Sequence, residues 1–479
     1  MSKTYVGARL RRLREERRMS QAELARTLGI SASYLNQMEH DSRPLTVPVL
    51  LRLTEAFGVD PGFFSERDTT RLVADLREAL AGEIAEDRVS PGDLAELAGR
   101  LPGVARVLLD LGRRNQRLSE DLVSGTADGL PAQHGDSPHP RPPAASPHEE
   151  IRDFFYRRQN YLHSTDLAAE RLAGEIGIRP GEITGALTAR LAGAHGVRLA
   201  ATPGDRLHHY DDGQRTLHLS PRLRPGQRAF RMATQLALLE HGEHLGDIAA
   251  EDFPPGSPAH ALARIGVARY YAAALVLPYT AFHTAAEEAR YDIERLTDHY
   301  GLGYETVCHR LSTLQRPRLR GVPFSFVRVD RAGNLSKRQS ATAFHFSRAG
   351  GTCPLWNVYE AFSSPGRIHV QLAEMPDGQR YLWTARAVTR HGGGWGEPGR
   401  TYAIGLGCEI RHAHRVVYSD GLDLTTSSAA TPIGMGCRVC ERPACSQRAV
   451  PPLGRALLID QHSSTFVPFP VAGEGPGDR

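Results

Sequence analysis

The sequence predicts a multidomain protein: an all-α helix-turn-helix domain, then a mainly α-helical middle domain with a small β-hairpin, then a cysteine-rich α+β domain. Two observations lead to this fold class. Apolar residues recur at helical spacing over roughly the first two thirds of the 479 residues, and alternating patterns at 324–329 and 367–372 follow. The length also exceeds what one hydrophobic core serves, so about three domains are expected.

Composition sets the expected boundaries. Residues 124–148 are Pro, Ser, Gly, His and Ala with almost no large apolar side chain, which predicts a disordered linker. The domains expected around it are 1–68 for the helix-turn-helix domain, 69–123 for a helical connector, 149–320 for the middle domain and 321–470 for the cysteine-rich domain. The helical pattern of the connector fits dimerisation and simple packing within the chain equally well.

The helix-turn-helix prediction depends on residues 20–39. Ser20 and Glu23 have the spacing of a capping box, and Gly29 follows the first helical run as a stop. Ser31 can cap a second short helix, whose inward residues include Leu35. Two short helices joined by a tight turn form the motif that places its second helix in the DNA major groove.

The outward face of that second helix carries small and amide side chains. Amides pair bidentately with adenine, and small residues let a helix approach base edges closely. The arginine-rich helix expected at 5–17 offers phosphate contacts, and further helices are expected at 46–57 and 60–64. The residues expected to contact DNA are Arg12, Arg14, Gln21, Ser31, Ala32, Ser33, Tyr34, Asn36, Gln37 and Arg43.

The middle domain opens with an aromatic and basic stretch at 151–161. It either packs into the core or faces an anionic, partly flat ligand such as a nucleotide-bearing thioester, because guanidinium groups match phosphates and aromatic rings stack on bases. The candidate ligand contacts are Arg157, Arg158 and Tyr161. A hairpin is expected over 197–219, and long helices over 228–240 and 259–277. Cys308 is expected to be a small core residue.

The strongest signal of the last domain is its thiol spacing. Cys437, Cys440 and Cys445 form a C-x2-C-x4-C pattern, which can converge on one metal centre. A fourth ligand must come from elsewhere, either Cys353 or Cys408. We favour Cys353, because its Gly-rich loop holds a ligand more readily than a strand does. Spacing alone leaves a structural zinc and an iron–sulfur cluster equally open.

Two stretches resemble known families. Residues 3–67 resemble the lambda-repressor-like, or Xre-type, DNA-binding domain, and the hairpin with its two long helices resembles the zinc-dependent peptidases of the ImmA/IrrE group. In that group the first long helix carries H-E-x-x-H, which binds zinc and activates water. Thr234, Gln235 and Leu238 occupy the matching positions here. The resemblance therefore implies a peptidase scaffold without peptidase chemistry, although nearby His241 and His244 could bind a metal.

The whole chain resembles the short-chain fatty acyl-CoA regulators, the RamB- and PrpR-like group. The resemblance is carried by the cysteine segment 437–452, by the Gly-Thr-Cys-Pro-Leu-Trp run at 351–356 and by the degenerate peptidase helix. It implies a transcription factor of carbon metabolism whose effector is CoA or a short-chain acyl-CoA. It also implies a [4Fe–4S] cluster on Cys353, Cys437, Cys440 and Cys445, with structural zinc as the alternative.

These expectations describe a regulator that is not an enzyme. Double-stranded DNA is the expected partner, and two half-sites would favour a homodimer. The alternative is a metalloprotease-type regulator that cleaves a partner repressor, which the missing histidines and glutamate disfavour. No run of eighteen apolar residues is present and the basic N-terminus lacks a signal-peptide core, so a cytoplasmic protein with no membrane contact is expected.

Overall fold

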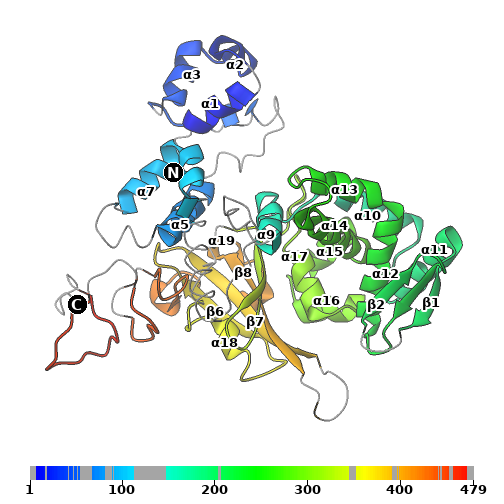
Figure 1. Ribbon diagram of the computed structural model, residues 1–479. Coiled ribbons are helices and arrows are strands. Elements are labelled where there is room, and N and C mark those ends of the chain that lie inside the picture. Colours follow the sequence, from blue (N-terminus) through cyan, green and yellow to red (C-terminus); the bar gives the residue numbers. More distant parts are fainter. Residues whose placement is uncertain are drawn as a thin grey trace, which may run out of the picture. The chain divides into compact units, whose positions relative to one another are not determined.

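The computed structural model describes residues 7–16, 19–40, 42–46, 48–53 except 51, 67–80, 89, 91–112 except 110, 147–342 except 203–205, 344, 352–390, 396, 399–452 except 441, 443 and 444, and 457–471. These residues belong to two compact units, and each is described by itself (Figure 1). The first unit comprises 1–143, 345–349 and 450–479, and the second comprises 144–344 and 350–449.

The first unit begins with the predicted helix-turn-helix. Its helices are α1 (Gly7–Glu16), α2 (Gln21–Thr27) and α3 (Ala32–Glu39). The capping box is confirmed, because the Ser20 side chain accepts from the Glu23 amide while the Glu23 carboxylate accepts from the Ser20 amide. Gly29 has a φ of +58°, which glycine adopts with little strain and which ends the first helix of the motif. The expected helix at 60–64 and much of that at 46–57 lie outside the described residues.

The connector contains α5 (Arg67–Ala79), α7 (Pro91–Arg100) and a helical stretch over 102–109. Their apolar faces meet in a small core of their own, which includes Leu76 and Leu94. On the outer side Leu101, Val104, Val107 and Leu111 are each about half exposed, at 56%, 49%, 58% and 53%. The predicted linker lies outside the described residues up to 146, and helix α9 begins at Pro147.

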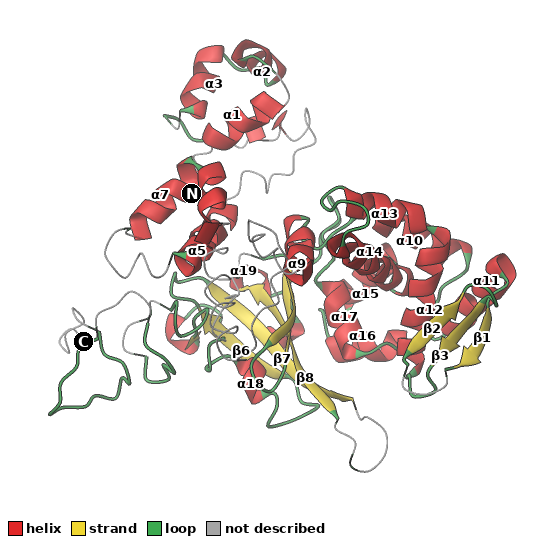
Figure 2. Ribbon diagram, in the orientation of Figure 1, coloured by secondary structure: helices red, strands yellow, loops and turns green. Residues whose placement is uncertain are grey.

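The second unit starts with a helical part that contains the predicted long helices (Figure 2). Its helices are α9 (Pro147–Arg157), α10 (His163–Glu175), α11 (Ile183–His195), α12 (Pro225–Glu240), α13 (Gly242–Ala250), α14 (Pro258–Val276), α15 (Tyr279–Glu288), α16 (Ile293–Tyr300) and α17 (Tyr304–Leu311). Helix α14 is the centre of this part, because α9, α10, α12, α13 and α17 all pack against it. Cys308 is fully buried in α17, as predicted.

The predicted hairpin is present with one more strand beside it. Strands β2 (His208–Asp211) and β3 (Thr216–Leu219) pair antiparallel across the turn, and β1 (Arg198–Ala201) pairs parallel to β3, so the order is β1-β3-β2. Leu217 and Leu219 are fully buried and join the helical core. The sheet therefore forms the edge of the helical part next to α11 and α12 (Figure 1).

The cysteine-rich part contains a six-stranded sheet in the order β5-β4-β8-β7-β6-β9. The strands are β4 (Phe324–Val329), β5 (Leu335–Ser340), β6 (His369–Glu374), β7 (Arg380–Arg390), β8 (Arg400–Glu409) and β9 (Thr431–Pro432), with short helices α18 (Asn357–Glu360) and α19 (Ile410–Ala413). Trp383 of β7 lies fully buried against Gly407 of β8, where an added Cβ would meet the indole ring at 2.4 Å. Only glycine fits there.

One core runs through both parts of the second unit. It joins Leu236 of α12 and Tyr271 of α14 to Phe326 of β4 and Cys408 of β8. Helix α17 lies at the junction, because it packs on α14 and on strands β4 and β8. None of the described helices has both the length and the apolarity that a membrane span needs.

Candidate functional site

The outward face of α3 is polar, as predicted. Ser31 caps the helix by accepting a hydrogen bond from the Tyr34 amide at 3.1 Å, while Leu35 and Met38 are buried. Asn36 and Gln37 are exposed, together with Ala32 and Ser33. Arg43 is exposed as well, and its guanidinium carbon lies 5.3 Å from the centre of the Tyr34 ring. The side chains predicted to contact bases therefore share one accessible surface.

A buried carboxylate links the three helices of this motif. The Glu39 side chain is fully buried, and Arg14 Nε donates to its Oε1 at 2.7 Å. Gln21 Nε2 donates to Glu39 Oε2 at 2.6 Å and to Asn36 Oδ1 at 3.3 Å. Arg14 thus has a structural partner inside the domain, and its predicted phosphate contact stays a prediction. The Arg12 side chain lies outside the described residues.

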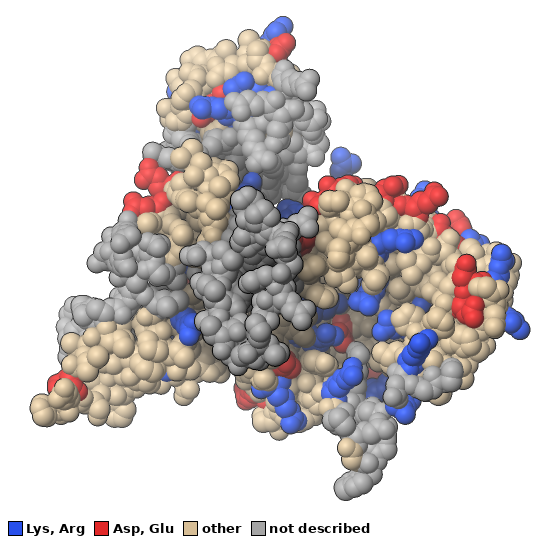
Figure 3. All heavy atoms as spheres, in the orientation of Figure 1, with Lys and Arg blue, Asp and Glu red and all other residues tan. Residues whose placement is uncertain are grey.

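The second unit contains a cleft of about 2410 Å³ with a strongly basic lining. Among the described lining residues, Glu305 alone contributes a carboxylate. Figure 3 shows Lys and Arg side chains in blue on the face of the unit that this view presents. The cationic side chains that line the cleft are Arg152, Arg222, Arg224, Arg231, Arg269, Arg328, Lys337, Arg338, Arg386 and Arg400. Because they come from 152 to 400 in the sequence, no single stretch revealed this site.

Charge crowding in the cleft shows in its pKa values. Glu305 acts on two of these cations: Arg328 Nη1 donates to its Oε1 at 2.9 Å, and its charge also acts on Lys337. Burial and the Arg328 guanidinium lower the pKa of Arg269, and burial lowers the pKa of Lys337 to about 8. Burial, with the charges of Lys337 and Arg310, also holds the pKa of His309 well below its usual range. Burial is the largest cause of these three shifts, and the neighbouring positive charges add to it.

Apolar side chains line part of the same cleft. They include Phe155 of α9, Phe230 of α12 and Ile265 of α14. The first turn of α17 also lines the cleft, and its N-cap residue, Gly303, provides no side-chain cap. A helix N-terminus carries partial positive charge and amide donors that suit phosphate groups. The cleft thus combines anion-binding groups with an apolar wall.

The predicted ligand contacts Arg157, Arg158 and Tyr161 lie away from this cleft. Arg157 Nη2 is 3.0 Å from Asp252 Oδ1, and Arg158 pairs with both Asp252 and Glu251. The Tyr161 hydroxyl accepts from Arg316 Nε at 3.1 Å and lies 2.9 Å from His163 Nδ1. Their predicted role in ligand binding stays a prediction.

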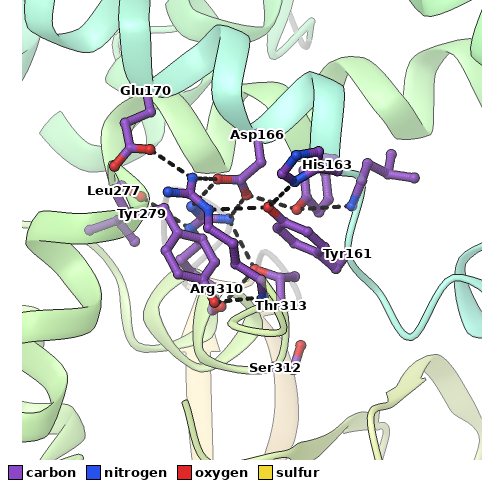
Figure 4. A network of polar contacts seen from close by, with 12 residues as sticks. Tyr161, His163, Asp166, Glu170, Leu277, Tyr279, Arg310, Ser312 and Thr313 are labelled. Carbon is purple, nitrogen blue, oxygen red and sulfur yellow. Dashed lines mark hydrogen bonds and ion pairs between the residues drawn. The ribbon is translucent and has the colours of Figure 1, made fainter. Parts of the chain in front are cut away.

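Tyr161 borders a buried ionic network that holds α10 to α17 (Figure 4). Arg310 and Asp166 form its centre, with both side chains fully buried and 2.7 Å between Arg310 Nη1 and Asp166 Oδ2. The Tyr270 hydroxyl donates to the same oxygen at 2.8 Å, and Arg310 Nε donates to the Leu277 carbonyl at 3.0 Å. Every charge at this centre therefore has partners, which indicates a structural role.

The helix that matches the peptidase motif is intact but lacks ligands. Thr234 and Gln235 are buried in α12, and the Thr234 hydroxyl donates to the Phe230 carbonyl at 2.7 Å. Glu240 pairs with Arg190 at 2.7 Å and with His195 at 2.9 Å, while His241 Nε2 lies 2.9 Å from the Tyr271 hydroxyl. Within the described residues no three His, Cys, Asp or Glu side chains are grouped to hold a metal ion.

Each of the four predicted thiols interacts electrostatically with at least one other, although among the described residues they do not form a group of three that could hold a metal ion. Burial raises the pKa of Cys353 most, and the thiols of Cys440 and Cys437 raise it further. Burial likewise raises the pKa of Cys440, with a smaller effect of Cys445. Cys408 is fully buried in β8; burial raises its pKa to about 12, and the charged neighbours that affect it are Glu409 and Arg415. This placement favours Cys353 over Cys408 as the fourth thiol.

Backbone amides surround these sulfurs. The Ala449 amide donates to Cys437 Sγ at 3.4 Å, and backbone donors at Gly434 and Arg442 act on Cys353 and Cys440. An added Cβ at Gly434 would meet Cys440 Sγ at 2.5 Å, so glycine allows the loop to lie against the thiol. Amide donors around sulfur are the usual outer partners of metal-bound thiolates, so the chemistry of the donor set fits such a centre, while the spacing of the described sulfurs in this structure does not form one.

Three family models and several characterised regulators match this chain. The helix-turn-helix domain model matches residues 6–62, the IrrE N-terminal-like domain model matches 192–312, and the model described as short-chain fatty acyl coenzyme A regulator, C-terminal, matches 313–469. The HTH-type transcriptional regulator RamB of Mycobacterium tuberculosis is 54% identical over 98% of this chain and 99% of its own.

The chain belongs to the short-chain fatty acyl-CoA regulator family.

Other members agree with this assignment. The regulator PrpR of Mycobacterium tuberculosis is 46% identical over 98% of this chain and 96% of its own, and the propionyl-CoA carboxylase regulator of Cereibacter sphaeroides is 43% identical over 98% and 99%. A solved Mycobacterium tuberculosis transcriptional regulator covers 68% of this chain and 99% of that chain, with 49% identity and a TM-score of 0.66.

Family membership confirms three predictions from the sequence. The chain is a DNA-binding transcriptional regulator, its fold is multidomain with a helix-turn-helix domain first, and its peptidase-like part belongs to a regulator and not to an enzyme. The alternative of a repressor-cleaving metalloprotease is therefore set aside. What sequence reasoning missed is the basic cleft, whose residues become neighbours only in the fold.

Proposed function

We propose that this regulator binds a CoA-type effector, CoA itself or a short-chain acyl-CoA, in the basic cleft of the second unit. The single observation that carries this is the excess of positive charge among the described lining residues, with nine arginines and one lysine against the carboxylate of Glu305, even though Arg386 also pairs with Glu294 outside the lining. CoA bears a pyrophosphate and a further phosphate, and arginine is the side chain best suited to such groups.

Size and polarity agree with this ligand class. The cleft encloses about 2410 Å³, more than the roughly 300–1,000 Å³ of an ordinary small-molecule pocket. An extended molecule with a charged nucleotide end and an apolar acyl end needs both kinds of wall, and Phe155, Phe230 and Ile265 offer the apolar one. Among the relatives, one is named for propionyl-CoA carboxylase, and the matching family model is named for short-chain fatty acyl-CoA.

The thiols are proposed to hold a metal centre. Cys353, Cys437, Cys440 and Cys445 would be its ligands, and a [4Fe–4S] cluster is preferred to structural zinc because of the family resemblance. When bound, such a cluster supplies a redox-sensitive fold element to this part of the chain. Arg448 shapes the loop that presents the thiols, since its guanidinium donates to the carbonyls of Cys437, Cys440 and Arg442.

The DNA-bound form is proposed to be a homodimer in the cytoplasm. Two copies of α3 can read two half-sites, which doubles the base and phosphate contacts. The exposed apolar residues of the connector, Leu101, Val104, Val107 and Leu111, recur at helical spacing and offer a face for the second copy. Effector and metal centre would act on DNA occupancy by binding two states of the regulator with different affinities.

Variants of the cleft test the effector site. Arg269→Ala removes a cation from the crowded part of the cleft, and Arg157→Ala removes one from the exposed pair with Asp252 outside it. We expect Arg269→Ala to weaken acetyl-CoA or propionyl-CoA binding by roughly ten- to a hundredfold, in line with the loss of about 1.5–3 kcal/mol for a hydrogen bond to a charged group. Arg157→Ala should bind like the unaltered protein in titration calorimetry.

Two results would contradict the proposal. Weaker CoA binding in Arg157→Ala with unchanged CoA binding in Arg269→Ala would place the effector site at residues 151–161 instead of in the cleft. No binding of any CoA species to the unaltered protein would remove CoA as the effector.

A further inference from the structure

One lysine lines the cleft, in a chain that has almost none. Lys3 and Lys337 are the two lysines of the 479 residues, although lysine and arginine together number 58. Lys337 lies in β5 directly opposite Arg328 of β4 and lines the cleft. Its Nζ is 5.5 Å from the centre of the buried Phe326 ring. The amine is thus held between an apolar floor and a crowd of guanidinium groups.

We propose that Lys337 is an acylation site, which accepts the acyl group of a CoA thioester held in the cleft. This inference rests on the proposed function, because the thioester must bind there first. It adds a covalent record of exposure to acyl-CoA, which reversible binding alone would not leave. Arg224, the N-cap residue of α12, also lines the cleft and is a candidate phosphate contact.

The reaction needs no partner beyond the thioester. The neutral amine of Lys337 attacks the carbonyl carbon, a C–N bond forms, and the C–S bond breaks. The departing thiolate takes up the proton that the nitrogen loses and leaves as CoA thiol, so atoms and electrons balance. The guanidinium groups of Arg328 and Arg269 can stabilise the negative charge that develops on the carbonyl oxygen.

The surroundings of Lys337 favour the reactive, neutral amine. Burial and the charges of Arg328 and Arg269 lower its pKa to about 8, against the opposing effect of Glu305. His309 of α17, which is neutral because its own pKa is lowered, and Arg152 of α9, which donates to the Leu335 carbonyl, complete the groups near β5. Lysines beside other cations or in desolvated sites are the ones that act as nucleophiles.

Lys3 provides a control within the same molecule. The full-length protein is incubated with acetyl-CoA or propionyl-CoA at several pH values, and acylation at each lysine is measured by peptide mass spectrometry after Glu-specific cleavage. At pH 7 an amine of pKa 8 has roughly two hundredfold more neutral form than an ordinary lysine, so we expect Lys337 to react at least about tenfold faster than Lys3. Its rate should rise up to about pH 8 and then level off, while that of Lys3 continues to rise.

Two variants and two conditions make the result decisive. K337R removes the nucleophilic amine and should lose the modification, whereas K3R should keep it. Acylation of Lys337 should disappear in protein unfolded by urea, and an acyl thioester of N-acetylcysteamine, which lacks the nucleotide, should react much more slowly.

The outcomes separate the inference from the function that it rests on. CoA binding without acylation of Lys337, or equal acylation by the truncated thioester, would overturn the inference and leave the effector site standing. Absence of both CoA binding and acylation would overturn both.

Discussion

The helix-turn-helix domain and the basic cleft use arginine in opposite ways. In the helix-turn-helix, Arg14 reaches inward to a fully buried carboxylate, Glu39, and fixes α1 to α3. In the cleft, Arg269 and Arg328 crowd around Lys337, and of the lining residues that the structure describes Glu305 alone contributes a carboxylate. The difference teaches that arginine content alone says little about binding. The balance between guanidinium groups and carboxylates at one place distinguishes a structural cation from one that awaits an anionic ligand.

The same contrast holds inside the second unit. Asp166 and Arg310 form a fully buried ion pair with further hydrogen-bond partners. Arg310 belongs to α17, the helix that also contributes Glu305 and His309 to the cleft. Helix α17 therefore contributes Arg310 to a buried, fully hydrogen-bonded ionic network and other side chains to the basic cleft. Four sets of variants test which residues have structural roles and which have binding roles.

Breaking the buried pair should have the largest effect. Asp166→Ala leaves the Arg310 guanidinium charged and buried, so the free energy of unfolding should fall by about 3–5 kcal/mol in urea titration. Asp252→Ala, which breaks the partly exposed pairs with Arg157 and Arg158, should cost less than about 1 kcal/mol. Equal losses in the two variants would remove the distinction between the two kinds of arginine.

The thiol centre gives the next largest effect. Cys353→Ser should lower the metal content or metal affinity of anaerobically purified protein at least tenfold, since outer partners of metal ligands alone are worth about 10–100-fold. Cys408→Ser alters another buried thiol, in β8, and serves as the control. Iron, zinc and sulfide analysis with an absorbance spectrum measures both. Metal loss in the Cys408 variant alone would move the fourth ligand to the strand.

Changes in the helix-turn-helix domain should affect DNA binding and not ligand binding in the cleft. Gln37→Ala removes an exposed amide from α3 and should weaken binding to the specific site by about 1–3 kcal/mol. Arg43→Ala should weaken binding to all sequences and reduce the salt dependence. Electrophoretic mobility shifts at several salt concentrations distinguish the two. Identical behaviour of both variants on specific and bulk DNA would contradict the division into base and phosphate contacts.

The smallest effect is a pH dependence set by the cleft. The pKa of His309 lies well below its usual value in the folded chain, so the unfolded chain binds more protons as the pH falls below about 6.5. Its neutral state therefore contributes stability that is present above that pH and is lost on acidification. His309→Gln should flatten the decline in thermal stability between about pH 6.5 and 5. An unchanged decline would place the responsible group elsewhere.

The local elements could be predicted because their causes are local. The capping box of Ser20 and Glu23, the stop at Gly29 and the outward amides of α3 follow from residues a few positions apart. The degenerate peptidase helix was also visible, since Thr234, Gln235 and Leu238 stand next to one another in the sequence. In each case one helical turn or one cap determines the geometry, and no distant residue is needed.

The sequence by itself therefore determined the helices, the reading face and the three clustered thiols of this regulator. Only the tertiary structure decided that Arg14 turns inward to Glu39, that Arg157 and Arg158 pair with α13-flanking acids, and that Arg152, Arg269, Arg328 and Lys337 share one cleft. The physical reason is that a charge acquires its role from the sum of all charges around it. That sum depends on residues nearly 250 positions apart, which only the folded chain brings together.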